Sequence, residues 1–228
     1  MIRALLAACA LTACASAPQT HAPIGRFYHY ERSNQDASLP EQIYQYRASA
    51  TRLEVGKEVE RCTNAAFVTS EFDPARGQGV SFTGGRLRRD LEQDPFAFLT
   101  YDAPTRTLSA NVPAFNVNES LTVAGEPYII YDFDLADLNA RFAGRPAPRE
   151  DFRFAVALIW PVEGAERVLR DLGWANARFV EVEDRRDPAQ ARYVVSGGLN
   201  GELWLDPSEG AWWARPCAAP LSRGGGDG

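Results

Sequence analysis

Apolar and polar side chains alternate with a period of two in many short stretches of the chain. The clearest stretch is residues 152–160, in which every second residue is apolar: Phe152, Phe154, Val156, Leu158 and Trp160. This alternation predicts a strand that is buried on one face. Other stretches alternate or are rich in β-branched and aromatic residues, and they predict further strands. They are residues 27–30, 42–46, 53–59, 65–72, 80–87, 96–101, 107–112, 117–123, 128–131, 177–182, 193–195, 202–205 and 211–215.

Turn residues separate these stretches, and two segments have the spacing of short helices. The first helix is expected to follow Asp134, a suitable N-cap residue, and to end at Gly144, with Leu135, Leu138 and Phe142 on one face. The second covers residues 165–172 and ends at Gly173. Because strands and helices do not alternate along the chain, the pattern predicts a mainly β protein with a single antiparallel sheet and one or two short helices.

The composition is that of a folded domain that does not bind nucleic acid. The chain has 228 residues, of which 45% are hydrophobic and 11% aromatic, and this is enough apolar material for a core. Its net charge is −6, and it contains no basic cluster, so nucleic acid is excluded as an expected partner.

The N-terminus has the pattern of an export signal. Arg3 is followed by a run of small and apolar residues that ends in Leu11-Thr12-Ala13-Cys14. The run is too short to span a bilayer and reads as a processing signal. This segment resembles the lipobox of bacterial lipoproteins, a family in which the signal is removed and the cysteine carries the lipid. The resemblance implies a signal peptide at residues 1–13 and lipidation at Cys14.

Two alternatives concern the cleavage. In the first alternative the signal ends at Leu6-Ala7-Ala8-Cys9, which also fits the lipobox, but cleavage there leaves the signal almost no apolar core. In the second, the segment is an ordinary secretory signal, so the protein reaches the same compartment without a membrane anchor.

The rest of the chain divides into a tether, a folded domain and a tail. Residues 14–25 are small and polar, as expected for a tether, and residues 219–228 are predicted to form a disordered tail. In lipoproteins an Asp after the cysteine often keeps the protein at the inner membrane, so the resemblance, with Ala15 at this position, implies the periplasmic face of the outer membrane. The folded β domain is therefore expected at residues 26–218.

Two cysteines, Cys62 and Cys217, lie in the expected folded domain. Export to an oxidising compartment favours a disulfide between them, and two buried free thiols are the alternative. Two thiols are too few for a zinc site without histidines, and the histidines are only His21, in the tether, and His29. No metal site is therefore expected.

Two sets of polar residues are candidates for a chemical site. His29 can act as a base with nearby acids such as Glu31, but no nucleophile motif accompanies it, so a packing or surface histidine is the alternative. Asp132, Asp134 and Asp137 form an acidic cluster whose spacing does not match an EF-hand, and helix capping explains it without calcium. No catalytic residue and no cofactor is assigned.

The aromatic residues of the second half suggest a site for an apolar ligand. All five tryptophans follow residue 159, and together with the aromatic strand they can line a cavity or fill an ordinary core. The predicted ligand-binding residues are Phe152, Phe154, Leu158, Trp160 and Trp204.

Two late segments carry a family resemblance. Tyr193-Val194-Val195-Ser196-Gly197-Gly198 and Gly201-Glu202-Leu203-Trp204-Leu205-Asp206 look like the last strands of periplasmic lipoprotein-carrier-like (LolA/VioE-type) proteins. The resemblance implies a curved antiparallel sheet or half-barrel that holds acyl chains. We therefore expect a non-enzymatic, lipid-anchored protein of the cell envelope that binds a hydrophobic ligand or an envelope partner. The alternatives are a small enzyme that uses His29 and a scaffold without a ligand.

Overall fold

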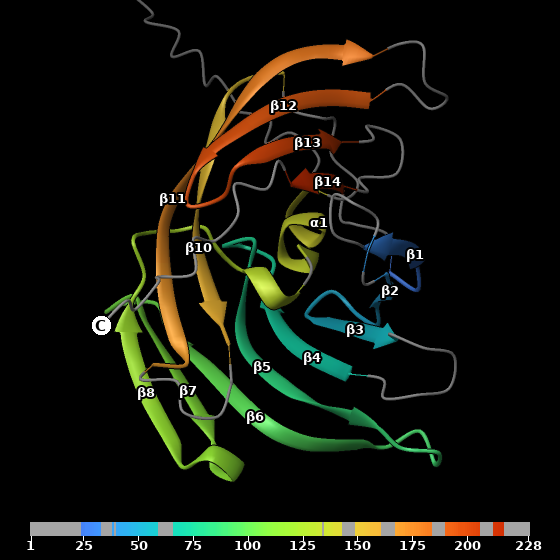
Figure 1. Ribbon diagram of the computed structural model, residues 1–228, viewed down its shortest axis with the longest axis vertical. Coiled ribbons are helices and arrows are strands. Elements are labelled where there is room, and N and C mark those ends of the chain that lie inside the picture. Colours follow the sequence, from blue (N-terminus) through green and yellow to red (C-terminus); the bar gives the residue numbers. More distant parts are fainter. Residues whose placement is uncertain are drawn as a thin grey trace, which may run out of the picture.

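The computed structural model describes residues 24–32, 38, 40–58, 66–133, 135–142, 149–160, 167–183, 190–205 and 212–216. These residues form two open sheets that curve around one short α-helix (Figure 1). The first sheet contains β1 (Phe27–Arg32), β2 (Glu41–Arg47), β3 (Arg52–Glu58), β4 (Ala66–Asp73), β5 (Gln78–Leu87), β6 (Gln93–Asp102), β7 (Thr107–Val112) and β8 (Val117–Thr122). The second contains β9 (Tyr128–Ile130), β10 (Phe152–Ile159), β11 (Leu169–Glu183), β12 (Gln190–Gly197), β13 (Gly201–Leu205) and β14 (Trp212–Pro216). The helical elements are η1 (Pro113–Phe115), η2 (Tyr131–Phe133) and α1 (Ala136–Phe142).

The first sheet is a meander in which each strand pairs antiparallel with the next one in the chain. Where the structure describes the connection in full, from β2 to β3 and from β4 to β8, short turns join the strands. In the β4–β5 turn, Asp73 Oδ1 accepts hydrogen bonds from the amides of Ala75 (2.8 Å) and Arg76 (3.2 Å), and Gly77 has a φ of 69°. Asp supplies the acceptor and Gly the left-handed conformation, so the chain reverses directly into β5.

The second sheet has the order β14-β13-β12-β11-β10-β9 and is antiparallel except between β9 and β10, which are parallel. In Figure 1, β10 and β11 run from this sheet down to the β7–β8 side of the first sheet, and α1 lies between the two sheets. The prediction of a mainly β, antiparallel protein with a short helix is confirmed, but the strands form two open sheets where a single sheet was expected.

Strand β10 is buried on both faces, whereas its alternation predicted one. Ala155 and Ala157 belong to a core shared with the first sheet, and Phe154 and Val156 belong to a second core that includes Leu138 of α1. At residues 155 and 157 the side chain on the first-sheet side is only a methyl group, which leaves room for the first sheet to approach. The alternating pattern therefore marks the larger side chains of a strand that lies between two cores.

The first predicted helix is confirmed as α1, and the second, at residues 165–172, is wrong where the structure describes it. Residues 169–172 begin β11 instead, and Leu172 is an extra residue opposite β10, where Val156 pairs with Gly173 and Ala157 with Asp171. Gly173 has a φ of 80°, so it serves a bulge in the strand and not the end of a helix. None of the helices in the described ranges has the length and hydropathy needed to cross a membrane.

Candidate functional site

The predicted apolar site begins with two phenylalanines on one face of β10. The rings of Phe152 and Phe154 are 6.1 Å apart, and Phe152 also lies 5.1 Å from Phe142 of α1 and 5.2 Å from Tyr193 of β12. Phe154 is only 2% exposed. These two residues therefore lie in a packed aromatic cluster between the second sheet and α1.

The other three predicted residues lie elsewhere. Leu158 is partly exposed beyond the bulge, and Trp160 is 52% exposed at the end of β10. Trp204 is buried, but its neighbours along β13, Leu203 and Leu205, point into the core with Phe154, so Trp204 points to the opposite face. Of the five residues, the structure brings together Phe152 and Phe154.

A larger apolar surface, which sequence patterning did not single out as a site, lies on the concave face of the first sheet. Phe72, Phe82 and Leu99 are each at most 5% exposed, and Phe133 of η2 packs edge-on against Phe82 at 5.2 Å. The apolar side chains of this face in the same core are Ile43, Leu53, Val55, Phe72, Phe82, Leu99, Leu108 and Ala110. Helix α1 covers part of this face from the side of β3 to β5 (Figure 1).

The contacts of α1 with the first sheet are small or polar. Ala136 and Ala140 are the helix residues that pack against the core of this sheet. Asn139 Nδ2 donates a hydrogen bond to Gln45 Oε1 at 2.5 Å, in a buried position. The helix thus rests on the first sheet without a large apolar side chain.

Arg47, at the end of β2, is a buried cation that reaches the last turn of α1. Its guanidinium donates to the carbonyl oxygens of Ala140 (3.3 Å), Ala50 (2.9 Å) and Ser49 (3.2 Å), and it lies 5.6 Å from the ring centre of Phe72. The residue is 6% exposed, and burial lowers the pKa of the guanidinium, with Tyr28 acting in the opposite direction. Within the described part of the chain, no carboxylate pairs with it.

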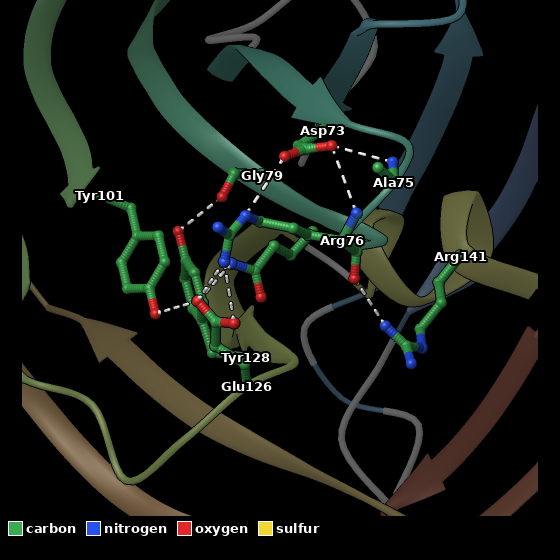
Figure 2. Close-up of polar contacts among 9 residues, drawn as sticks. Asp73, Ala75, Arg76, Gly79, Tyr101, Glu126, Tyr128 and Arg141 are labelled. Atoms are coloured by element: carbon green, nitrogen blue, oxygen red, sulfur yellow. Dashed lines mark hydrogen bonds and ion pairs between the residues drawn. The ribbon is translucent and has the colours of Figure 1, made fainter. Parts of the chain in front are cut away.

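A second polar cluster joins the β4–β5 turn to the segment before β9 (Figure 2). Glu126 accepts hydrogen bonds from Arg76 Nη1 (3.1 Å to Oε2), Tyr101 Oη (2.8 Å) and Gln78 Nε2 (3.3 Å). Burial, followed by the contact with Glu126, raises the pKa of Tyr101 far above its usual value. Tyr101 therefore stays protonated and acts as a donor.

Asp137, in the first turn of α1, is fully buried close to Tyr128. Desolvation raises the pKa of Asp137 to about 7, although the amides of Ile130 and Gly79 favour the charged form. The Ile130 amide donates to Oδ2 at 3.3 Å, and Tyr128 Oη donates to the Gly79 carbonyl at 2.8 Å. Because a carboxyl that is 1% exposed is out of reach of a solute, Asp137 supports the junction of strand and helix from the inside.

The acidic cluster of the sequence is not a cation site in the described residues. Asp137 is buried among the groups above, and Asp132 Oδ2 accepts a hydrogen bond from the Ile159 amide at 3.0 Å. Asp134 lies outside the described residues. Nowhere in the described ranges do three His, Cys, Asp or Glu residues gather closely enough to hold a metal ion.

His29 lies on the exposed face of the first sheet. Its ring stacks on Tyr44 at 4.6 Å with an interplanar angle of 8°, and Nε2 shares a hydrogen bond with Gln42 Oε1 at 2.8 Å. Gln42 Nε2 in turn donates to Glu31 Oε2 at 2.9 Å. His29 is thus part of an exposed cross-strand cluster on β1 and β2.

Several expected features fall outside the described residues and stay predictions. They are the signal peptide, Cys14 and most of the tether, both cysteines of the expected disulfide, Cys62 and Cys217, and the tail at residues 219–228. No family model, curated protein or solved structure matches the chain.

Proposed function

We propose that this protein is a lipid-anchored protein of the cell envelope that binds an apolar molecule on the concave face of its first sheet. Cys14 would carry the lipid that holds it to the membrane, on the periplasmic face of the outer membrane. The observation that carries the binding proposal is the mismatch between α1 and the surface that it covers. Most of this face is apolar, apart from Gln45 and Arg47 on β2, whereas the helix meets it with two alanines and with polar groups.

Because of this mismatch, we expect that an apolar ligand can displace α1 from the concave face. Polar links hold it to the first sheet: Asn139 to Gln45, Arg47 to the Ala140 carbonyl, Arg141 to the Arg76 carbonyl at 2.9 Å, and the Gly79 amide to Asp137. A neutral hydrogen bond of this kind contributes about 0.5–1.5 kcal/mol and one from a guanidinium about 1.5–3 kcal/mol, because water replaces the lost partner when the helix moves away. An acyl chain that replaces the helix regains the apolar contacts at about 25 cal/mol per Å² of buried surface.

The experiment measures uptake of an uncharged fluorescent probe, the methyl ester of anthroyloxy-labelled palmitic acid, by the full chain carrying Cys14→Ser. Asn139→Ala removes one link between α1 and the first sheet, so the open form becomes more populated and the apparent affinity should rise about fivefold. Asn118→Ala, at an exposed position of β8, is the matched control and should leave uptake unchanged. If neither the parent chain nor Asn139→Ala takes up the probe, the proposal fails.

The anchor has its own test. Cys14→Ser should move the protein from the membrane fraction to the soluble fraction, because the thiol that accepts the lipid is lost. Mass spectrometry of the mature protein should find a lipidated N-terminus at Cys14, and an unmodified N-terminus at any other residue would refute the anchor. The same measurement without reductant should show Cys62 and Cys217 in one linked pair of peptides.

A partner protein is the second candidate, and exposed aromatic residues on the outside of the first sheet favour it. Phe98 is 41% exposed on β6, whose neighbouring residues Ala97 and Leu99 point inward, and Phe96 is 39% exposed. Exposed aromatic residues are typical of protein interfaces. Cross-linking in cells from a photoreactive residue at position 98, with position 109 on the exposed face of β7 as control, separates a specific partner from random contact.

A further inference from the structure

The chemistry around Arg47 indicates what kind of apolar molecule the concave face can hold. The guanidinium has three carbonyl partners and no carboxylate among the described residues, although it is 6% exposed. A buried cation without an anion is costly, since carbonyl dipoles replace only part of its hydration. Among the residues that the structure describes, Arg47 is thus a buried positive charge without a carboxylate counter-ion.

The position of Arg47 places this charge at the rim of the apolar surface. Arg47 pairs with Leu53 across β2 and β3, and its guanidinium lies against the ring of Phe72. Leu53 and Phe72 both belong to the apolar face. Two of its carbonyl partners, on Ser49 and Ala50, belong to the adjacent β2–β3 turn. The third, on Ala140, belongs to α1.

Displacement of α1 changes these partners unequally. The turn carbonyls stay with Arg47, because they are part of the same sheet, whereas the Ala140 carbonyl leaves with the helix. The guanidinium then has free N–H donors that face the vacated space. A planar group with several N–H donors matches the two oxygens of a carboxylate or a phosphate better than any neutral acceptor.

We propose that Arg47 binds the head group of the ligand, and that the ligand is an amphiphile with an anionic head, a carboxylate or a phosphate ester, whose chain lies on the face formed by Leu53, Phe72 and their neighbours. This inference rests on the proposed function, since it requires the concave face to be accessible. It adds the charge of the ligand and the direction in which it lies. The head is at the β2–β3 turn, and the chain points along the sheet toward β5.

The experiment compares anthroyloxy-labelled palmitic acid with its methyl ester on the full chain carrying Cys14→Ser. Displacement of α1 is common to both probes, so the ratio of their dissociation constants reports the head group alone. The parent chain should bind the acid roughly tenfold more tightly than the ester or better, as expected for a charge-assisted hydrogen bond. Arg47→Gln should bring the ratio close to one, Arg47→Lys should keep most of it, and Arg52→Gln, an exposed arginine of β3, should leave it unchanged.

The outcomes separate this inference from the proposed function. If the parent chain binds acid and ester equally, the head-group role of Arg47 is refuted while apolar binding stands, and this result needs no variant. If the ratio is high but Arg47→Gln preserves it, another cation binds the head and the assignment to Arg47 is overturned. If neither probe binds, the proposed function itself fails.

A competition experiment identifies the head group more closely once binding of the labelled acid has been measured. Displacement of the acid by hexadecyl phosphate, with hexadecanol as control, shows whether a phosphate head is accepted as well as a carboxylate.

Discussion

Helix α1 contacts the second sheet through large apolar side chains, and it contacts the first sheet through alanines and polar groups. Leu138 packs into the core with Phe154 and Tyr193, and Phe142 lies against Phe152. On the other side, Asn139 reaches Gln45, and the Ala140 carbonyl receives Arg47. One seven-residue helix thus has two unlike interfaces.

The difference indicates which parts of the molecule move together. Apolar packing is lost entirely when two surfaces separate, whereas polar groups regain hydrogen bonds from water. Helix α1 should therefore be held more firmly to the second sheet than to the first sheet, while the two sheets stay joined through the core that they share. The predictions below test this division.

The largest effect is expected on the apolar side. Phe154→Ala removes a ring that is 2% exposed and leaves a cavity, so the free energy of unfolding should fall by about 3–5 kcal/mol. Denaturant unfolding measures it, with Leu158→Ala, at a partly exposed position of the same strand, as the control that should cost less. Equal losses in the two variants would show that the core between α1 and the second sheet is not tightly packed.

The next effect concerns pH and Asp137. Burial raises the pKa of Asp137 from 3.8 to about 7, so the native state holds one more proton than the unfolded state between these values, and the contribution to stability falls as pH rises through this window. Asp137→Asn removes the titration. Relative to the parent chain, the variant should gain roughly 2–4 kcal/mol between pH 4 and pH 8. Denaturant unfolding at both pH values measures this gain, and a difference that does not depend on pH would contradict it.

A smaller effect is expected at the contact between β8 and the start of β11. The carboxylate of Glu119 accepts hydrogen bonds from the amides of Val168 (3.0 Å) and Leu169 (3.1 Å) and so joins the two sheets directly. Glu119→Gln keeps the shape but removes the charge and one acceptor, and it should lower the free energy of unfolding by about 1–3 kcal/mol. Glu71→Gln, on an exposed side chain, should change it by less than about 0.5 kcal/mol.

The smallest effect is expected at Trp160. This side chain is 52% exposed and belongs to neither core, so Trp160→Ser should change the free energy of unfolding by less than about 1 kcal/mol. It should also leave uptake of the uncharged probe unchanged. A loss of uptake would extend the ligand site to the end of β10, as the sequence pattern predicted.

Local patterns in the sequence identified most of the strands and the helix at α1, because alternation and turn residues act over a few positions. They did not predict that β10 is buried on both faces, since this depends on β9 and the first sheet, which are distant in the chain. Gly173 shows a similar limit. A glycine after apolar residues ends a helix or forms a bulge with the same local sequence, and here pairing with β10 determines the outcome.

The candidate site was harder to predict than the fold. The alternating aromatic residues predicted a site on β10, and two of them, Phe152 and Phe154, lie together. No local pattern indicated that Arg47 and Asp137 would be buried. Arg47 ends a strand of alternating polar and apolar residues, and Asp137 has the position of an ordinary first-turn acid. Their burial results from α1 lying between the two sheets, and no short stretch of sequence encodes that arrangement.

The strand order of the first sheet also has a consequence for folding kinetics. Every pair in this sheet joins consecutive strands, so all of its hydrogen bonds can form as soon as Thr122 has left the ribosome or the export channel. The parallel pair of β9 and β10 has to wait for the segment between them, and contacts between distant segments form slowly. We therefore expect an early intermediate in which the first sheet is paired but its concave face is uncovered. During that interval the newly made chain would expose the apolar side chains of this face, and a chaperone that holds unfolded chains could bind them.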